Sequence, residues 1–238
     1  MKSKRWMKRM AILDLLMLGT LLFLRISQPQ AMQTISHESN RIVSDSDGME
    51  RDHDEKKIAI TFDDGPHPVY TQRLLDGLKE RHVVATFFVT GENANAHPEI
   101  IKREHDEGHL IGNHTYSHIQ LTKGNRDTFR QELIETNTVL KEITGEDVLY
   151  VRPPYGSWDK AFEKELNMFP VLWNIDPLDW CSHNADCIAA KIVEAADEGD
   201  IILLHDYYDT SVEAALKAVD ALKERGYTFV TVEELLLD

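Results

Sequence analysis

From Lys56 onward, short apolar runs alternate with longer segments in which apolar residues recur at helical spacing. The apolar runs, which predict buried strands, are Ile58–Phe62, Ala85–Val89, Leu110–Gly112, Val148–Val151, Val171–Ile175, Ile201–Leu204 and Tyr227–Val230. The segments with helical spacing are Tyr70–Glu80, Glu99–Glu107, Thr128–Ile143, Asp159–Met168, Ala185–Ala196 and Ser211–Arg225. Strands that alternate with helices form parallel sheets, because each helix returns the chain to the start of the next strand. The pattern therefore predicts an α/β fold, a distorted, TIM-like (β/α) barrel of about seven parallel strands.

The N-terminal part of the chain does not share this pattern. A basic cluster is followed by the apolar run Met10–Ile26, which contains one acidic residue. Basic residues before an apolar stretch direct the following chain across a membrane, and this run is close to the minimum length that spans a bilayer. We expect residues 1–30 to be a signal peptide or a membrane anchor, 31–55 a flexible polar spacer, and 56–238 the folded domain. The sequence does not decide whether the first segment is cleaved or retained.

The net charge of the chain limits the classes of molecule that it can bind. The formal net charge is −15, but residues 1–30 hold six basic side chains and one acidic one, so the remaining 20 basic and 40 acidic residues carry −20. A domain this acidic lacks the basic footprint that nucleic acid or anionic lipid requires. We therefore exclude nucleic-acid binding, and we expect membrane contact only through the N-terminal segment if that segment is uncleaved.

Polar residues gather where the predicted strands end, which is the edge at which barrel enzymes place their chemistry. The first strand runs into Asp63 and Asp64 before a Gly-Pro turn, and the third runs into His114 and His118. The two histidines share one face if their segment is helical. Two imidazoles and one carboxylate leave a coordination position open, as in catalytic metal sites. Taken singly, the acidic pair is equally typical of a solvated turn. A lone histidine pair is more often part of a protein surface than of a metal site, but the two aspartates at the same edge reverse that expectation here.

The fourth strand ends at Arg152, which is followed by two prolines and Tyr155. An arginine beside an acid orients it and lowers its pKa. The rigid double proline suits the presentation of a main-chain N–H to a developing oxyanion. In isolation, the same segment is equally typical of a proline-rich turn with a surface arginine.

The fifth and sixth strands end in the last candidates. The fifth is followed by Asp179 and Trp180, and the sixth contains Leu203 and ends at His205. A histidine after a run of aliphatic residues is suited to proton transfer once a carboxylate orients it. A tryptophan is more often a core residue than a substrate contact, but beside a catalytic edge an aromatic and an aliphatic side chain form a pocket for a methyl group.

Five segments, TFDDGP, HTYSH, RPPYG, DPLDW and IILLH, occur in this order along the chain. Together they resemble the polysaccharide deacetylase family, which carries the NodB homology domain and is carbohydrate esterase family 4. The resemblance covers roughly residues 56–232, so it implies a NodB-type barrel for the whole domain. It also implies a metal-dependent hydrolase that removes N-acetyl groups from N-acetylglucosamine-type residues of an extracytoplasmic polysaccharide and releases acetate.

The resemblance assigns the residues of the metal site and the base. It implies that Asp64, His114 and His118 bind a divalent metal, most commonly Zn²⁺ or Co²⁺. Asp63 would be the general base that activates water at the metal, and Arg152 would hold and tune Asp63. The second aspartate of the first motif is present, so we expect metal binding to be intact.

The resemblance also assigns the acid and the substrate contacts. It implies that His205 is the general acid that protonates the departing sugar amine and that Asp179 orients it. The backbone N–H of Tyr155, with the metal, would stabilise the oxyanion. Trp180 and Leu203 would flank the acetyl methyl group.

The sequence leaves the substrate and several details open. Export and a short spacer favour peptidoglycan as the substrate, with chitin or chitooligosaccharide next. The alternatives are a hydrolase of small cyclic amides, similar to allantoinase, and an inactive glycan-binding relic. Cys181 and Cys187 are close enough in sequence to form a disulfide but are equally compatible with free thiols. His67 is given no role, and the oligomeric state is not predicted.

Overall fold

A computed structural model describes residues 56–237, and the predicted anchor (1–30) and spacer (31–55) lie outside the described residues. The strands are β1 (Lys56–Asp63), β2 (Thr86–Val89), β3 (Leu110–Asn113), β4 (Tyr150–Val151), β5 (Phe169–Pro170), β6 (Ile201–His205) and β7 (Tyr227–Phe229). They form a single sheet in the order β5-β4-β3-β2-β1-β6, and β7 pairs with the first residues of β1. Every pairing is parallel, which confirms the predicted distorted barrel.

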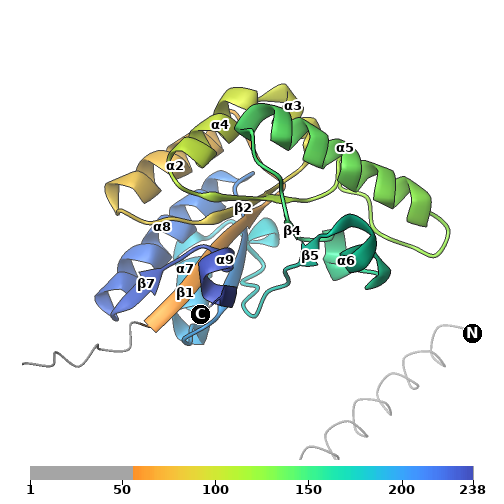
Figure 1. Cartoon of the computed structure of the whole chain (residues 1–238). Helices are drawn as coiled ribbons and strands as arrows, with labels where there is room; N and C mark the ends of the chain where they lie inside the picture. Colours follow the sequence, from red (N-terminus) through yellow and green to blue (C-terminus); the bar gives the residue numbers. More distant parts are fainter. Residues whose placement is uncertain (1–55, 238) are drawn as a thin grey trace, which may run out of the picture. The chain divides into compact units, whose positions relative to one another are not determined.

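The helices cover the sheet and bury its outer side. They are α2 (Tyr70–Glu80), α3 (Gly91–Ala96), α4 (Pro98–Asp106), α5 (Arg126–Thr144), α6 (Ala161–Leu166), α7 (Ala185–Ala195), α8 (Asp209–Glu224) and α9 (Val232–Leu237), with the 3₁₀ helices η1 (Pro154–Gly156) and η2 (Asp179–Cys181). Figure 1 shows α2, α4, α3 and α5 following one another across one side of the domain, with α7 and α8 near β1 and β7. Residues from Ile58 to Asp63 are all buried, as expected for a central strand of a parallel sheet covered on both faces.

The predicted strand Val171–Ile175 is wrong in its bounds. The regular strand is β5, at Phe169–Pro170, and only Ile175 makes an isolated bridge, to Ile202 of β6. The residues between do not form a ladder, because the guanidinium of Arg152 takes the carbonyls of Val171 and Leu172. This segment nevertheless carries the chain from β5, at one edge of the sheet, to β6, so an irregular stretch closes the barrel.

The short helix α3 was not predicted from the sequence. It begins after Thr90, whose side chain accepts a hydrogen bond from the backbone N–H of Asn93, and six residues are too few for an apolar period to show. Gly91 permits the close packing of this helix, since an added Cβ would lie 2.4 Å from the Tyr116 ring and 2.6 Å from Thr136 Oγ1. The consequence is that α3 lies directly beside the carboxyl ends of β1 and β3.

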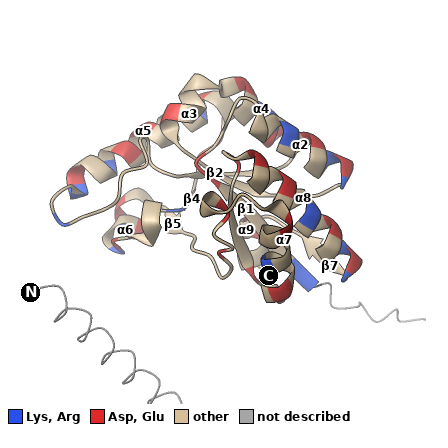
Figure 2. Ribbon diagram, turned by 180° about the vertical axis from the view of Figure 1, so that it is seen from behind, with Lys and Arg blue, Asp and Glu red and all other residues tan. Residues whose placement is uncertain are grey.

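The surface carries both signs of charge along most helices (Figure 2). Ion pairs join neighbouring helices, such as Arg103 of α4 with Asp76 of α2 and Lys217 of α8 with Asp186 of α7. These pairs are too exposed to contribute much stability. No helix within residues 56–237 is long and apolar enough to cross a membrane. Cys181 and Cys187 are exposed free thiols, so the disulfide that the sequence left open is not formed in this structure.

Candidate active site

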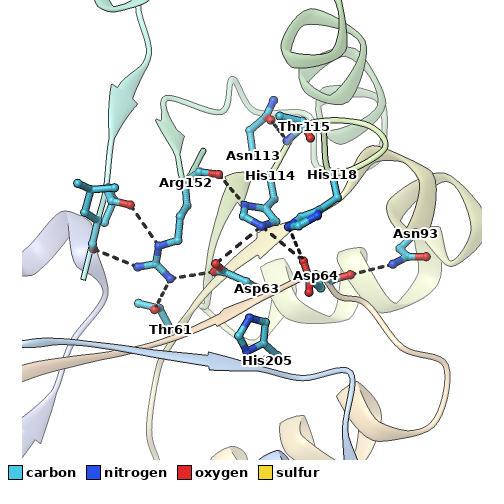
Figure 3. A network of polar contacts seen from close by, with 12 residues as sticks. Thr61, Asp63, Asp64, Asn93, Asn113, His114, Thr115, His118, Arg152 and His205 are labelled. Atoms are coloured by element: carbon cyan, nitrogen blue, oxygen red, sulfur yellow. Dashed lines mark hydrogen bonds and ion pairs between the residues drawn. The ribbon is translucent and has the colours of Figure 1, made fainter. Parts of the chain in front are cut away.

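A cavity of about 400 Å³ opens at the carboxyl ends of β1, β3 and β6. Eight of the ten residues singled out in the sequence line it, namely Asp63, Asp64, His114, His118, Tyr155, Trp180, Leu203 and His205. The other two, Arg152 and Asp179, lie behind its wall, where they are 0% and 1% exposed. The predicted edge of the barrel is therefore the place where these residues meet (Figure 3).

The two aspartates of the first motif separate at the end of β1. Asp63 is still in the strand and pairs in register with His205 of β6, whereas Asp64 has a left-handed backbone with φ 73°. An extended Asp64 would point away from Asp63, but the left-handed turn brings both carboxylates to the same cavity. Oδ1 of Asp63 is bonded to Arg152, and Oδ1 of Asp64 lies 3.4 Å from Nε2 of both His114 and His118.

The histidine pair is not presented by a helix, so the condition under which the two rings would share a helical face is not met. The chain after β3 is irregular, and Thr115 and His118 both have positive φ, 63° and 57°. The two reversals turn the rings toward one another, with their centroids 4.9 Å apart. Glu132 on α5 holds this turn, because its carboxylate accepts hydrogen bonds from the backbone N–H groups of Tyr116 and Ser117.

The donor set of Asp64, His114 and His118 fits a divalent cation. Nδ1 of His114 lies 2.6 Å from the carbonyl oxygen of Arg152, an acceptor only, so Nδ1 carries the proton and a neutral ring presents the lone pair of Nε2. That lone pair faces Oδ1 of Asp64, which is buried without a hydrogen-bond partner among the described residues. Two acceptors repel one another unless a proton or a cation lies between them, and a cation fits the distance, because ligands roughly 2.1 Å from a tetrahedral zinc lie roughly 3.4 Å apart.

The electrostatics of Asp64 agree with this arrangement. Burial raises the pKa of the Asp64 carboxyl, but the neighbouring His114 and His118 more than offset burial and leave the pKa below its ordinary value. Desolvation by burial lowers the pKa of His118, only partly opposed by Asp64. The carboxyl is thus ionised and the imidazole neutral at neutral pH, which are the protonation states that metal ligands need.

Asp63 is held by a fully buried arginine. Nη1 of Arg152 donates to Oδ1 of Asp63 at 2.8 Å and to Thr61 Oγ1 at 2.6 Å, and the guanidinium lies 4.2 Å from the ring centroid of Phe88. Thr61 in turn donates to the carbonyl of Ile202 at 2.6 Å. The other oxygen of Asp63, Oδ2, lies 3.8 Å from Nε2 of His114, on the cavity side. One oxygen is therefore anchored and the other is available to accept a proton.

His205 and Asp179 form the second buried pair. Nδ1 of His205 lies 2.8 Å from Oδ1 of Asp179, and Oδ2 of Asp179 accepts the backbone N–H of His205 at 2.9 Å. Burial lowers the pKa of His205, but the hydrogen bond and charge of Asp179, followed by the charges of Asp63 and Asp64, raise it to about 9. The imidazole is therefore protonated at neutral pH, with its Nε2–H free to donate.

The remaining predicted residues complete the walls. Tyr155 lies in η1 with φ 59°, and its backbone N–H has no partner among the described residues. Trp180 is half exposed in η2, whereas Leu203 is buried in β6. Sequence reasoning missed Trp173 and Tyr208, which also line the cavity. No local pattern marks them, because both reach the site only through the irregular segments that follow β5 and β6.

A parallel barrel that carries a three-ligand group, an anchored carboxylate and a protonated histidine around one cavity has the arrangement of a hydrolytic enzyme. The model of one family, described as polysaccharide deacetylase, matches residues 50–171. The chain belongs to this family, carbohydrate esterase family 4, and is a deacetylase, as its motifs predict.

Three relatives illustrate the family. A peptidoglycan-N-acetylglucosamine deacetylase of Bacillus cereus is 39% identical over 190 residues, which are 77% of this chain and 69% of the relative. The Bacillus subtilis peptidoglycan-N-acetylmuramic acid deacetylase PdaC is 38% identical, and the match spans 39% of its sequence. A solved structure of PdaC has a TM-score of 0.74, with 77% of this chain and 91% of that chain covered. A pseudoenzyme of the same family from Bacillus anthracis has a TM-score of 0.71 and 27% identity, with 77% and 66% covered.

Proposed function

We propose that this chain hydrolyses the acetamide of N-acetylated amino sugars in peptidoglycan, outside the cytoplasm, with the help of a divalent cation. The observation that carries the proposal is the convergence of the three-ligand group with two buried pairs, Asp63–Arg152 and His205–Asp179, on one cavity. The substrates named for the relatives favour peptidoglycan as the polymer. The basic and apolar N-terminal segment favours export.

A divalent cation such as zinc or cobalt, held by Asp64, His114 and His118, would polarise the acetyl carbonyl and lower the pKa of water. Asp63 accepts the proton of the attacking water through Oδ2, because Arg152 holds Oδ1 and stabilises the ionised carboxylate. This division of labour needs the two aspartates to have different partners, which the left-handed backbone at Asp64 provides.

His205 is the general acid. Its Nε2–H donates a proton to the sugar nitrogen as the C–N bond breaks, while Asp179 holds Nδ1 and stabilises the imidazolium. The free backbone N–H of Tyr155 donates a hydrogen bond to the oxygen of the tetrahedral intermediate. Trp180 and Leu203 form the apolar contact for the methyl group. Acetate and a free amine are the products.

Two other functions remain to be tested against this proposal. The first is glycan binding by a domain that has lost its catalytic activity, and the structural relatives include a pseudoenzyme. In this chain, however, the base, the acid and the three ligands are all present and oriented. Hydrolysis of small cyclic amides is the second, and the N-terminal targeting pattern disfavours it because such substrates are cytoplasmic.

The test measures acetate released by the full-length chain from purified peptidoglycan and from chitooligosaccharides. The chain is stripped with a chelator and then supplied with zinc or cobalt. The proposal requires metal-dependent release that Asp63→Asn abolishes and that Asp147→Asn leaves unchanged, since Asp147 is exposed and precedes β4 at the opposite end of the sheet. Release that persists without metal or in Asp63→Asn refutes the mechanism, and metal binding without release from either polymer refutes the substrate.

A further inference from the structure

A second cavity, also of about 400 Å³, adjoins the first. The two share Asp64, His118 and Tyr208, so two of the three ligands lie on the boundary between them. Figure 3 shows Asn93 on the side of Asp64 that faces away from Asp63 and Arg152, and Asn93 lines the second cavity. A polymer whose acetamide reaches the first cavity therefore has a continuous path into the second.

Three tyrosines contribute aromatic surface to the walls of the second cavity. Tyr116, Tyr207 and Tyr208 line it, and Tyr207 and Tyr208 are each 41% exposed, which leaves ring surface available for a ligand. Flat aromatic faces provide much contact area with little loss of conformational entropy. Tyr207 and Tyr208 lie two and three residues after His205 in the chain, so the segment that carries the proposed acid also carries one wall of this cavity.

Tyr207 is positioned by His67, to which the sequence assigned no role. The two rings meet edge to face with centroids 5.0 Å apart. His67 itself is fixed, because its Nδ1 accepts the backbone N–H groups of Val69 and Tyr70 and its ring stacks on the Tyr70 ring at 4.3 Å. An aromatic wall supported in this way is a built feature of the fold rather than a loose surface side chain.

Outside the three-ligand group, whose charge a bound divalent cation would offset, the second cavity carries one negative side chain. Apart from the ligands Asp64 and His118, its charged lining residue is Glu92, on the first turn of α3. The Glu92 carboxylate is exposed and has no hydrogen-bond or ion-pair partner within residues 56–237. No lysine or arginine lines the cavity to neutralise it. Nearby, the Asn93 amide donates to the carbonyl of Asp64 at 2.8 Å, which leaves its oxygen free to accept from a hydroxyl or an amine.

We propose that the second cavity binds the hexosamine next to the reacting sugar, and that Glu92 makes this position favour a neighbour with a free amine over one with a carboxylate. The proposal rests on the proposed function, because it takes the first cavity to hold the reacting acetamide. Its physical basis is that aromatic walls bind a sugar ring of any substitution, whereas an unpaired carboxylate distinguishes a cation from an anion. Chains that already contain deacetylated residues would consequently be better substrates than chains rich in acidic substituents.

The experiment uses disaccharides, in both orders of linkage, in which one residue carries an isotope-labelled N-acetyl group. The neighbouring residue carries an acetamide, a free amine or a carboxylate at C6. We measure kcat/KM for release of labelled acetate by the full-length chain and by Glu92→Gln, Tyr207→Ala and the control Glu224→Gln. Glu224 is exposed and ends α8, at the opposite end of the sheet from the cavities.

The wild type and Glu224→Gln should prefer the amine neighbour over the carboxylate neighbour by roughly two- to fivefold, the size expected of a solvent-exposed charge pair. Glu92→Gln should bring this ratio close to one, and high salt should do the same in the wild type. Tyr207→Ala should raise KM for all disaccharides but not for a labelled N-acetylglucosamine monosaccharide. An amine preference that survives in Glu92→Gln, or a Tyr207→Ala defect that extends equally to the monosaccharide, overturns the proposal.

Binding of the same disaccharides by calorimetry separates this proposal from the proposed function. If no variant releases acetate but binding still depends on Glu92 and Tyr207 as described, the proposed function fails and the second cavity stands. If acetate is released and neither residue affects the choice of neighbour, the second cavity fails and the proposed function stands. Equal melting temperatures of the variants exclude a folding defect, which matters for Glu92 because an acidic residue in a first helical turn also stabilises the helix.

Discussion

Replacing Asp179 with asparagine removes the negative charge beside His205. The side chain keeps its size and an oxygen that accepts the backbone N–H of His205. Asp179 is the largest contributor that raises the pKa of His205 from 6.5 to about 9, ahead of Asp63 and Asp64. A pKa shift of one unit corresponds to about 1.36 kcal/mol. The buried site therefore stabilises the imidazolium, relative to the neutral ring, by an amount on the order of 3 kcal/mol. Most of this stabilisation should be lost in Asp179→Asn.

The expected consequence is a change in the pH dependence of deacetylation. At pH 8, a histidine with a pKa of about 9 is about 90% protonated, whereas one at its ordinary value of 6.5 is about 3% protonated. The alkaline limb of kcat/KM should therefore move to lower pH by one to two units in Asp179→Asn, and the loss of activity should be larger at pH 8 than at pH 6. Titration of the His205 ring by NMR gives the pKa independently of catalysis.

The stability of the domain should also fall in Asp179→Asn, but with the opposite pH dependence. Because the pKa of His205 is raised in the folded state, its contribution to stability is fully present below 6.5 and is lost as the pH rises through about 9. Asp179→Asn should consequently destabilise the domain most at pH 6 and least above pH 9, as measured by urea unfolding. A uniform loss of kcat with an unchanged alkaline limb and an unchanged NMR pKa would show that Asp179 does not act through the charge of His205.

Three further predictions concern residues that hold or line the site. Arg152→Met should cost about 3–5 kcal/mol in urea unfolding, because it leaves the buried carboxylate of Asp63 unpaired, and the cost should fall when Asp63→Asn is also present. Gly65→Ala should lower stability by about 1–3 kcal/mol and reduce activity, since its Cβ would lie 2.3 Å from the buried carboxylate of Asp206; a variant as stable as the wild type would contradict this packing. His118→Ala should fold normally, because this side chain is 35% exposed, yet should bind zinc at least roughly 100-fold more weakly in a competition with a chelator.

Much of the fold could be predicted because burial imposes a pattern on the sequence. The runs that became β1 and β6 are aliphatic and buried, and the helix predicted at Tyr70–Glu80 has the same bounds in the structure. Prediction failed at Val171–Ile175, where an apolar run suggests a strand but the partner of its carbonyls is the guanidinium of Arg152. A side chain that replaces a neighbouring strand leaves no signal in the local hydrophobic pattern.

The candidate site likewise has a part that the sequence predicts and a part that it does not. The strand ends pointed to one edge of the sheet, because parallel strands bring their carboxyl ends together, and the family resemblance of the five segments then assigned the ten residues. Their orientation was not predictable, since it depends on positive φ angles at Asp64, Thr115 and His118. None of these residues is a glycine, so no residue type advertised the turns, and tertiary contacts such as Glu132 with the turn before His118 stabilise them instead.

The fold alone does not separate an active deacetylase from a pseudoenzyme, because a pseudoenzyme of the family has nearly the same TM-score as an active relative. The separation has to come from protonation states. Hydrolysis needs an ionised base and a protonated acid at the same pH, and an unperturbed histidine is mostly neutral at neutral pH, so the acid needs surroundings that raise its pKa. Here Arg152 pairs with Asp63 from behind one wall, and Asp179 raises the pKa of His205 from behind the other. Each supporting residue is fully buried and pairs with a group that faces the cavity, so both desolvated charges serve the reacting pair, and this arrangement favours activity over binding alone.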